Sequence, residues 1–172
     1  MKIGVVSDTH LQSGGLPKTL VDRLQGVDLI LHAGDVITLQ PLRQLERIAS
    51  VTAVQGNMDW SDVRSALPYK TVIEVSGRRI GLIHGHRVPN PNQVLPPPID
   101  FEALHAYLLS EFEGENLDCI VYGHTHQSYS GWYNGVLMVN PGSATGSGRS
   151  RGTFAILTVG PGQLDAQIVE LP

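Results

Sequence analysis

Five short polar motifs recur along this chain, and each directly follows an apolar run with the length and composition of a β-strand. They are Asp8-Thr9-His10, Gly34-Asp35, Gly56-Asn57-Met58-Asp59, His84-Gly85-His86 and Gly123-His124-Thr125-His126. Polar residues that follow parallel strands meet at the carboxyl edge of a sheet, where open α/β folds build their sites. Asp, Asn and His are also the side chains that hard and borderline divalent metals select. The pattern therefore predicts one shared polar site at a sheet edge.

Strands and helices alternate in the first third of the chain. Apolar, β-branched runs predict strands at residues 2–7, 27–32 and 51–54. Leucine-rich stripes predict helices between them, the first over residues 17–25. We expect Gly26 to end this first helix and Thr38 to cap the second, which tolerates Pro41 in its first turn. Such alternation indicates parallel βαβ units.

The rest of the chain is richer in strands. Residues 71–75 and 79–83 predict a hairpin, and the five prolines within residues 88–98 predict an extended, non-helical segment. Asp100 can cap a following helix with an apolar stripe that faces the core. Further strands are predicted at residues 119–122, 128–133, 136–139, 153–159 and 164–171. We therefore expect one α/β domain over residues 1–172, in which two packed sheets have helices outside them.

Composition and charge limit the partners of the chain. The net charge of −4 and the pI near 5.9 argue against a broad, sequence-independent grip on nucleic acid. No apolar run approaches the roughly 18 residues of a membrane span, and the amino-terminal run reads as a strand and not as a signal peptide. The single Cys119 lies inside an apolar run and is expected to be a small core hydrophobe, and one cysteine cannot form an internal disulfide. These features are compatible with a cytoplasmic location, which we expect.

The motifs offer ligand atoms of particular kinds. Asp8 and His10 lie where the chain can curl and point both side chains at one ion, and the two oxygens of Asp35 could bridge two cations. Asn57 offers a neutral carbonyl oxygen, which suits Mn²⁺, Mg²⁺ or Fe²⁺. On a strand, His124 and His126 would share a face with Cα atoms roughly 6–7 Å apart, too far for one ion to hold both easily. Two metals about 3.5–4 Å apart could take one histidine each.

In this order, the series D-x-H, G-D, G-N-x-D, H-G-H and G-H-x-H resembles the calcineurin-like metallophosphoesterases. Residues 81–86 and 140–146 are similar to the small, single-domain branch of YfcE-like phosphodiesterases. The same branch includes the retromer subunit that serves as a protein-binding scaffold. The resemblance covers essentially the whole chain and implies the metallophosphoesterase fold, a four-layer α-β-β-α sandwich of two mixed sheets with flanking helices.

Carried over residue by residue, the resemblance implies two divalent metal ions and seven ligands. The ligands of the first ion would be Asp8, His10, Asp35 and His126, and those of the second would be Asp35 as a bridge, Asn57, His84 and His124. Mn²⁺ is the expected metal, with Fe²⁺, Ni²⁺ and Zn²⁺ as alternatives. The implied reaction is phosphoester hydrolysis, more often of a diester, in which a metal-activated hydroxide attacks phosphorus in line.

Three residues are further candidates for catalysis: Asn57, His86 and Asp59. Many family members carry a His where this chain has Met58, whose thioether cannot protonate a leaving oxygen. We therefore expect a preference for good leaving groups and take His86 as the substitute proton donor. Asn57 could donate its amide N–H to the phosphate. Asp59 either orients a ligand histidine or caps the segment that follows.

Other polar residues are expected to be structural. His32 is expected to be a hydrogen-bonded strand residue, and His105 a packed or partly exposed helix residue without a catalytic role. Residues 140–143 predict a turn that supports the wall of the site. Arg149 and Arg151 could grip a substrate phosphate, although solvated loop arginines are the commoner outcome.

The alternative to an enzyme is a catalytically weak protein-binding scaffold of the same fold. A scaffold should have lost metal ligands, whereas all seven positions here carry competent side chains, which favours the enzyme. Met58 keeps the scaffold alternative open. A DNA nuclease of the same superfamily would need extra domains and a basic surface that the chain lacks. The expected partner is therefore a small phosphoester and not a membrane or nucleic acid, and a homodimer or higher homo-oligomer fits the pairing common among small members.

Overall fold

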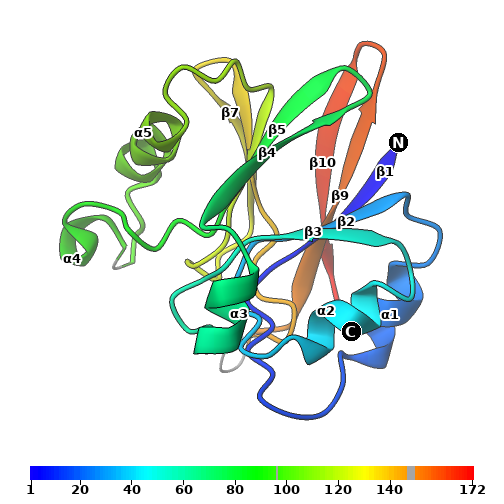
Figure 1. The fold of residues 1–172 in the computed structure, drawn as a ribbon. Coiled ribbons are helices and arrows are strands. Elements are labelled where there is room, and N and C mark those ends of the chain that lie inside the picture. Colours follow the sequence, from blue (N-terminus) through cyan, green and yellow to red (C-terminus); the bar gives the residue numbers. More distant parts are fainter. Residues whose placement is uncertain (96, 147–149) are drawn as a thin grey trace.

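The computed structural model describes residues 1–95, 97–146 and 150–172, and its strands form two five-stranded sheets (Figure 1). The first sheet has the order β10-β9-β1-β2-β3 and the second the order β4-β5-β6-β8-β7. The strands of the first sheet are β1 (Lys2–Val6), β2 (Leu29–His32), β3 (Ser50–Ala53), β9 (Thr153–Gly160) and β10 (Gln163–Glu170). Those of the second are β4 (Lys70–Val75), β5 (Arg78–Ile83), β6 (Cys119–Val121), β7 (Tyr129–Tyr133) and β8 (Val136–Asn140).

Both sheets mix parallel and antiparallel pairs. β1, β2 and β3 run parallel to one another, as the predicted βαβ units require, and β9 pairs antiparallel with β1. In the second sheet β5, β6 and β8 are parallel, while β4 and β7 are antiparallel edges. The predicted hairpin is β4–β5, whose turn residues Ser76 and Gly77 both have positive φ, at 50° and 76°. Two positive φ values in a row give a turn whose twist matches that of the flanking strands.

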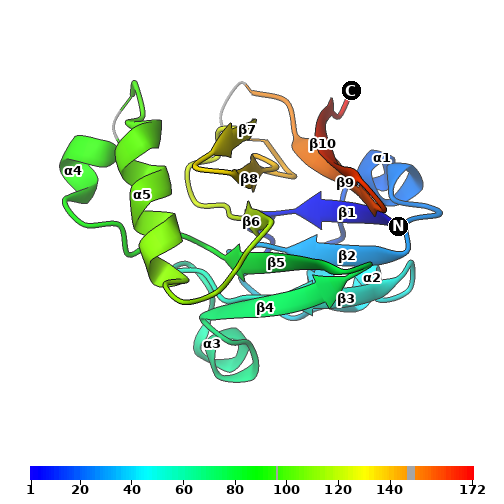
Figure 2. The ribbon, with the colours of Figure 1, turned by 90° about the horizontal axis from the view of Figure 1, so that it is seen from above.

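Helices cover the outer faces of the two sheets. They are α1 (Lys18–Arg23), α2 (Gln40–Leu45), α3 (Ser61–Ala66), α4 (Pro91–Val94) and α5 (Phe101–Glu111). Leu20 and Leu45, from α1 and α2, pack with Ile30 on the first sheet, and Leu104 and Leu108, from α5, are buried in the cluster that includes Ile120 and Tyr122 of the second. Figure 2 shows α5 on the side of the second sheet and α1 on the side of the first. The layers are therefore α-β-β-α, which confirms the predicted fold class.

The core between the sheets follows from strand alternation. Cys119 and Val121 of β6 face the first sheet, whereas Ile120 and Tyr122 face α5. Cys119 is fully buried, and burial raises the pKa of its thiol well above the usual range, so it acts as a core hydrophobe as expected. No helix among the described residues is long and apolar enough to cross a membrane.

Three local predictions differ from the structure. Residues 88–98 were expected to lack helix but contain α4, which Pro91 can begin because a first helical residue needs no N–H partner. Thr38 does not cap α2, because its hydroxyl donates to the Leu11 carbonyl at 3.3 Å and Leu39 takes the cap position. The short α3 was not predicted, because only its Val63 is buried and its sequence therefore shows no apolar stripe. The predicted cap of α5 is confirmed, with Ala103 N–H donating to Asp100 Oδ1 at 3.0 Å.

Candidate metal centre

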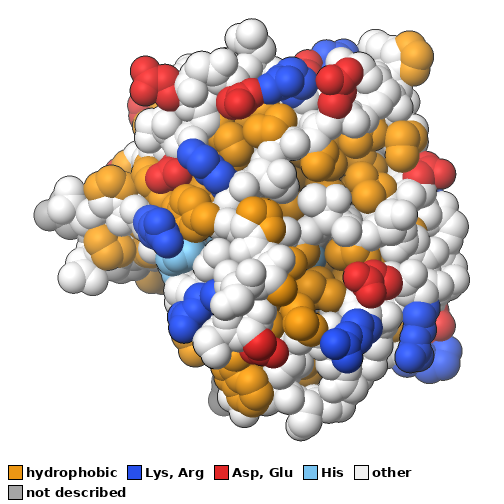
Figure 3. All heavy atoms as spheres, in the orientation of Figure 1, with side chains coloured by type: hydrophobic (Ala, Val, Ile, Leu, Met, Phe, Trp, Pro, Cys, Tyr) orange, Lys and Arg blue, Asp and Glu red, His pale blue; other side chains and the backbone are white. Residues whose placement is uncertain are grey.

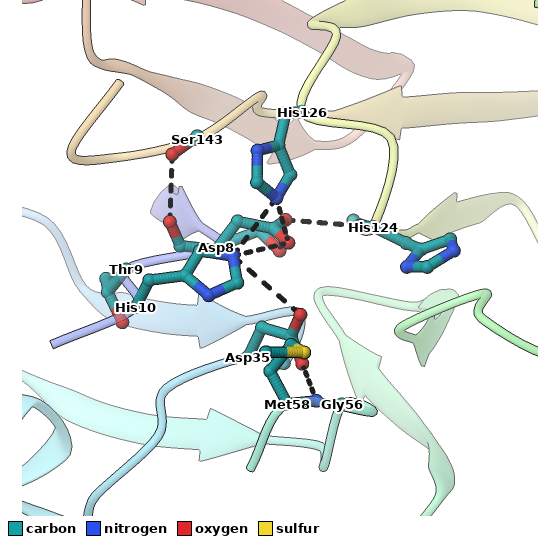
Figure 4. Close-up of polar contacts among 12 residues, drawn as sticks. Asp8, Thr9, His10, Asp35, Gly56, Met58, His124, His126 and Ser143 are labelled. Carbon is teal, nitrogen blue, oxygen red and sulfur yellow. Dashed lines mark hydrogen bonds and ion pairs between the residues drawn. The ribbon is translucent and has the colours of Figure 1, made fainter. Parts of the chain in front are cut away.

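The five polar motifs meet where the carboxyl ends of both sheets come together. Asp8 and His10 follow β1, Asp35 follows β2, and Asn57 lies beyond the end of β3. The second sheet contributes His84 and His86 after β5, and His124 and His126 after β6. Figure 4 shows Asp8, His10, Asp35 and His126 pointing toward one another from different strand ends. The shared site expected at one sheet edge is therefore built from two.

The backbone of this region is unusual at the predicted ligands. Positive φ values occur at Asp8 (52°), His10 (47°), Asp35 (55°), His124 (69°) and His126 (57°). This left-handed conformation costs a non-glycine residue roughly 1–2 kcal/mol, and such strain collects at functional sites. His124 and His126 consequently lie in the connection between β6 and β7 and not on a strand, which corrects the strand geometry assumed for them.

Two groups of ligand atoms share Asp8. In the group Asp8, His10 and His126, the Asp8 Oδ1 atom lies 3.2 Å from His126 Nε2 and 3.6 Å from His10 Nε2. The two ring nitrogens are themselves 3.0 Å apart. In the group Asp8, Asp35 and His84, Asp35 Oδ2 lies 3.3 Å from His84 Nε2, and it is also 3.8 Å from His10 Nε2. Within each group all ligand atoms lie within 4.8 Å of one another, so each could surround a cation.

Two buried atoms of these groups have no hydrogen-bond partner among the described residues: Asp8 Oδ1 and His84 Nε2. The His84 Nδ1 atom is 2.7 Å from the Ala33 carbonyl, so it carries a proton, and in the neutral ring Nε2 is an acceptor. That acceptor faces the carboxylate of Asp35, which is also an acceptor. Buried acceptors that face each other need a cation or a proton between them. The donor set, of carboxylate oxygens and imidazole nitrogens, fits divalent ions such as Mn²⁺ or Zn²⁺.

The charges of these groups depend strongly on one another. Burial raises the pKa of Asp8, but the nearby imidazoles of His10 and His126 outweigh it and hold that pKa well below the usual range. Burial lowers the pKa of His84, but contacts with Asp35 and Asp8 outweigh it and raise that pKa. For His124, burial and the nearby His84 lower the pKa to about 4. The cluster thus combines the ionised carboxylates of Asp8 and Asp35 with His84, whose pKa these carboxylates raise.

Asp59 and Asn57 belong to the loop that follows β3. Asp59 is buried and accepts from the N–H of Ile37 at 2.7 Å and from that of Gly56 at 2.7 Å. Neither hydrogen bond involves a ligand histidine or a residue of α3. Asp59 instead connects the loop that carries Asp35 to the loop that carries Asn57, a role that the sequence did not suggest. Asn57 is exposed, and the N–H of the next residue, Met58, donates to Asp35 Oδ1 at 2.8 Å.

His86 borders the second group without belonging to it. Its ring centroid lies 5.5 Å from that of His84, 6.3 Å from that of His124 and 5.6 Å from that of Tyr69. Its Nδ1 atom is buried and has no hydrogen-bond partner among the described residues. Burial, together with His84 and His124, lowers the pKa of His86 to about 4.

Residues predicted to be structural support the walls of the site. His32 is fully buried and hydrogen-bonded, with Nε2 3.3 Å from Thr9 Oγ1 and with Nδ1 accepting from Gly34 N–H. The turn at residues 140–143 braces two motifs, since Ser143 Oγ donates to the Asp8 carbonyl and Asn140 Nδ2 to that of Gly123. A Cβ atom at Gly123 would lie 2.0 Å from Ser7 Oγ and 2.8 Å from Asp8 Oδ2, so the close approach requires glycine.

A polar cavity of about 510 Å³ adjoins His126. Its lining consists of His126, Gln127, Ser128, Ser143, Ser150, Arg151, Thr153 and Glu170. Arg151 therefore lies beside the candidate metal groups, while Arg149 falls outside the described residues. The cavity provides hydroxyl, amide and charged groups for a polar ligand next to the histidine.

Comparisons with known proteins agree with this geometry. Residues 1–162 match the calcineurin-like phosphoesterase superfamily domain. A probable metallophosphoesterase of Methanocaldococcus jannaschii is 40% identical over 147 residues, which are 84% of this chain and 69% of that protein. A phosphodiesterase of the same archaeon is 24% identical over 159 residues, which are 85% of this chain and 86% of that protein. The crystal structure of wild-type Vps29 from Entamoeba histolytica complexed with Zn²⁺ has a TM-score of 0.74 and 26% identity and covers 99% of each chain.

The resemblance predicted from the motifs is therefore confirmed across the whole fold. The family match includes all five motifs, and the fold match covers nearly every residue. The chain belongs to the calcineurin-like phosphoesterase superfamily.

Proposed function

We propose that this protein is a metal-dependent phosphodiesterase whose site holds two divalent ions. The observation that carries the proposal is the pair of ligand groups built around Asp8, in which buried acceptor atoms face one another without a hydrogen-bond partner among the described residues. One ion would lie in the group of Asp8, His10 and His126, and the second would lie beside Asp35 and His84 of the other group. Asp35 Oδ2 lies near His10 of one set of histidines and His84 of the other, which suits a ligand shared by neighbouring ions.

The two ions would take ligands from both sheets. Asp8, His10 and His126 would hold one of them together with Asp35, and Asp35 would bridge to the other, which Asn57, His84 and His124 would complete. Mn²⁺ is our first choice, because carboxylate, amide and imidazole ligands suit it. Fe²⁺, Ni²⁺ and Zn²⁺ suit the same donors, and Zn²⁺ is bound in the Vps29 structure.

The residues of the chain would bind the substrate and handle protons. A pair of divalent ions supplies Lewis acidity, which polarises phosphate oxygens and lowers the pKa of water. Asn57, exposed at the rim, would donate its amide N–H to the phosphate. His86, whose Nδ1 has no partner among the described residues, would supply a proton to the leaving oxygen. Its pKa of about 4 leaves little of the ring protonated at neutral pH, so this help would be small there and would grow as pH falls. Met58 is 55% exposed at the rim but has no proton to give, so esters with good leaving groups should react fastest.

The surroundings of the site favour a diester over a monoester. The cavity beside His126 offers room for one ester arm, and the surface around His86, Tyr69 and Arg87 offers a place for the other. A monoester would use only one of these places. We also propose that the chain acts as one domain over residues 1–172, on a small phosphoester, in the cytoplasm, and that it forms a homodimer or higher homo-oligomer.

The second candidate function is a catalytically weak protein-binding scaffold. The likeness to Vps29 and the Met58 substitution favour it, while the intact ligand set favours the enzyme. The test is hydrolysis of bis(p-nitrophenyl) phosphate and of p-nitrophenyl phosphate by metal-stripped protein that is resupplied with Mn²⁺. We expect Mn²⁺-dependent turnover that favours the diester. Absence of turnover with every divalent metal, despite bound ions, would instead support the scaffold, and a preference for the monoester would contradict the phosphodiesterase.

A further inference from the structure

Arg87, which follows His86 in the loop after β5, is exposed but held in place. Its guanidinium carbon lies 4.0 Å from the centroid of the Tyr69 ring, which is the geometry of a cation–π contact. Figure 3 shows a histidine at the surface of this face, near the place where β4 begins in Figure 1, with Lys or Arg side chains near it. A guanidinium fixed in this way loses less side-chain entropy when it binds a ligand than a free one does.

The Tyr69 ring is itself anchored on two sides. Its hydroxyl oxygen lies 3.0 Å from that of Tyr107 on α5, and its ring lies nearly perpendicular to that of His86, with centroids 5.6 Å apart. His86 in turn borders His84 and His124. Contacts therefore run without interruption from Arg87 to the candidate metal centre.

The donors of Arg87 are not used inside the protein. Among the described residues, its guanidinium makes no hydrogen bond and no ion pair. The acid near Tyr107 is Glu111, and that carboxylate is paired with Lys70, whose Nζ lies 3.3 Å from Glu111 Oε2. A guanidinium whose face is covered by a ring still presents its edge of N–H donors, which matches the oxygens of a carboxylate or phosphate.

The position of Arg87 separates it from the scissile phosphate. It belongs to neither ligand group, and its guanidinium packs on the ring of Tyr69, which in turn touches His86, a residue outside both groups. We propose that Arg87 binds a second anionic group, carried on one arm of the substrate, and so selects phosphodiesters whose arm bears a carboxylate or phosphate. This inference rests on the proposed function and names the substrate class of the same site.

The test uses two diesters that share a leaving group: p-nitrophenyl phenyl phosphate and p-nitrophenyl 4-carboxyphenyl phosphate. The measured quantity is the ratio of kcat/KM for the carboxylated ester to that for the plain ester, with Mn²⁺-loaded protein. We expect Arg87→Ala to lower this ratio about fivefold, the upper range for an exposed charge pair, and mainly through KM. Arg87→Lys should keep part of the ratio, because it keeps the charge but not the fork of donors. Arg23→Ala, an exposed arginine on α1, is the matched control for lost charge and should leave the ratio at the wild-type value.

Equilibrium binding of the same two diesters, measured by calorimetry, separates the inference from the proposed function. If the wild-type protein hydrolyses neither ester but binds the carboxylated one more tightly in an Arg87-dependent way, the phosphodiesterase fails and the anion site stands. An equal loss for both esters in Arg87→Ala would overturn the inference, because Arg87 would then act on the shared phosphate. An unchanged ratio in both measurements would overturn it as well.

Discussion

His84 and His105 are both buried and both belong to the part of the fold built around the second sheet, but their surroundings differ. His105, on α5, is 1% exposed, and its Nε2 atom lies 2.9 Å from the hydroxyl of Tyr122. The rings of Phe101, Tyr129 and Tyr133 pack around it at centroid distances of 5.7, 4.7 and 5.5 Å. His84 is fully buried as well, yet its Nε2 atom has no hydrogen-bond partner among the described residues and faces the Asp35 carboxylate at 3.3 Å.

The difference shows that burial alone does not mark a functional histidine. Burial lowers the pKa of His105 to about 4, so this ring is a neutral core residue with a satisfied polar atom. At His84 the carboxylates of Asp35 and Asp8 reverse the effect of burial and raise the pKa. The raised pKa favours a proton between Nε2 and the carboxylate, and a metal ion can take the place of that proton.

The largest effect is expected for Asp35→Ala, which removes the proposed bridge between the two ions. We expect kcat/KM for bis(p-nitrophenyl) phosphate to fall by about 10²–10³ or more, the range seen when one stabilising group is lost. The free energy of unfolding should fall by only about 1 kcal/mol, through the lost hydrogen bond from Met58. Asp22→Ala, an exposed acid on α1, is the control for charge. Wild-type turnover in Asp35→Ala would contradict the assignment of the bridge.

The next effect concerns the structural histidine. His105→Ala should lower the free energy of unfolding by about 2–4 kcal/mol, because it leaves a cavity and an unpaired Tyr122 hydroxyl. His105→Phe should recover part of this loss by filling the space. Neither change should alter the number of Mn²⁺ ions bound, as measured by calorimetry. If His105→Ala folded normally but lost metal, the distinction between the two histidines would be wrong.

A smaller effect is expected at Asp59, a buried acid whose two oxygens are both satisfied by backbone amides. Asp59→Asn places an amide N–H against one of these donors and should loosen the loops that carry Asp35 and Asn57. We expect the affinity for Mn²⁺ to fall about 10–100-fold, as is typical of groups that position metal ligands. Asp28→Asn is the matched control, since Asp28 accepts the Lys2 N–H at 2.7 Å on the exposed surface. Equal losses in both variants would show that Asp59 has no particular link to the site.

The smallest effect is a pH dependence of stability. The pKa of His105 is about 4 in the folded protein and about 6.5 in the unfolded chain, so the unfolded chain takes up the proton first as pH falls. The stabilisation by neutral His105 is therefore complete above pH ~6.5 and is lost as pH falls toward ~4, by about 1–2 kcal/mol between pH 7 and pH 5. The residues around the ring, Tyr122, Tyr129 and Tyr133, carry no charge in this range.

Urea unfolding of the wild-type protein and His105→Gln at pH 7 and pH 5 measures this contribution. The difference between the two proteins isolates His105 from the other histidines. We expect the wild-type protein to lose more stability than the variant on going to pH 5. Equal losses in the two proteins would contradict a buried, neutral His105.

Much of the fold could be predicted from the sequence, because its elements have strong local signals. The parallel strands, the β4–β5 hairpin and the Asp100 cap follow from alternation, turn residues and capping chemistry. Short helices such as α3 and α4 could not be predicted, because a helix of four to six residues buries too few residues to show an apolar stripe.

The site could be predicted as a set of residues but not as a geometry. The motif order pointed to Asp8, Asp35 and His84, which the structure brings together. The left-handed backbone at five of the ligand positions could not be read from the sequence, since tertiary contacts impose it on residues that do not favour it. The hydrogen bond from Ile37 to Asp59 and the contact of Arg87 with Tyr69 join residues that are far apart in the chain. Local sequence patterns therefore cannot predict them.

The most direct measurement is the number and affinity of Mn²⁺ ions bound per chain, obtained by calorimetry on metal-stripped protein. The wild-type protein and His105→Gln should each bind two ions. His84→Ala, which removes a proposed ligand of the second ion alone, should bind one ion with high affinity. Two ions bound by His84→Ala with wild-type affinity, or fewer than two bound by the wild-type protein, would contradict the two-metal site.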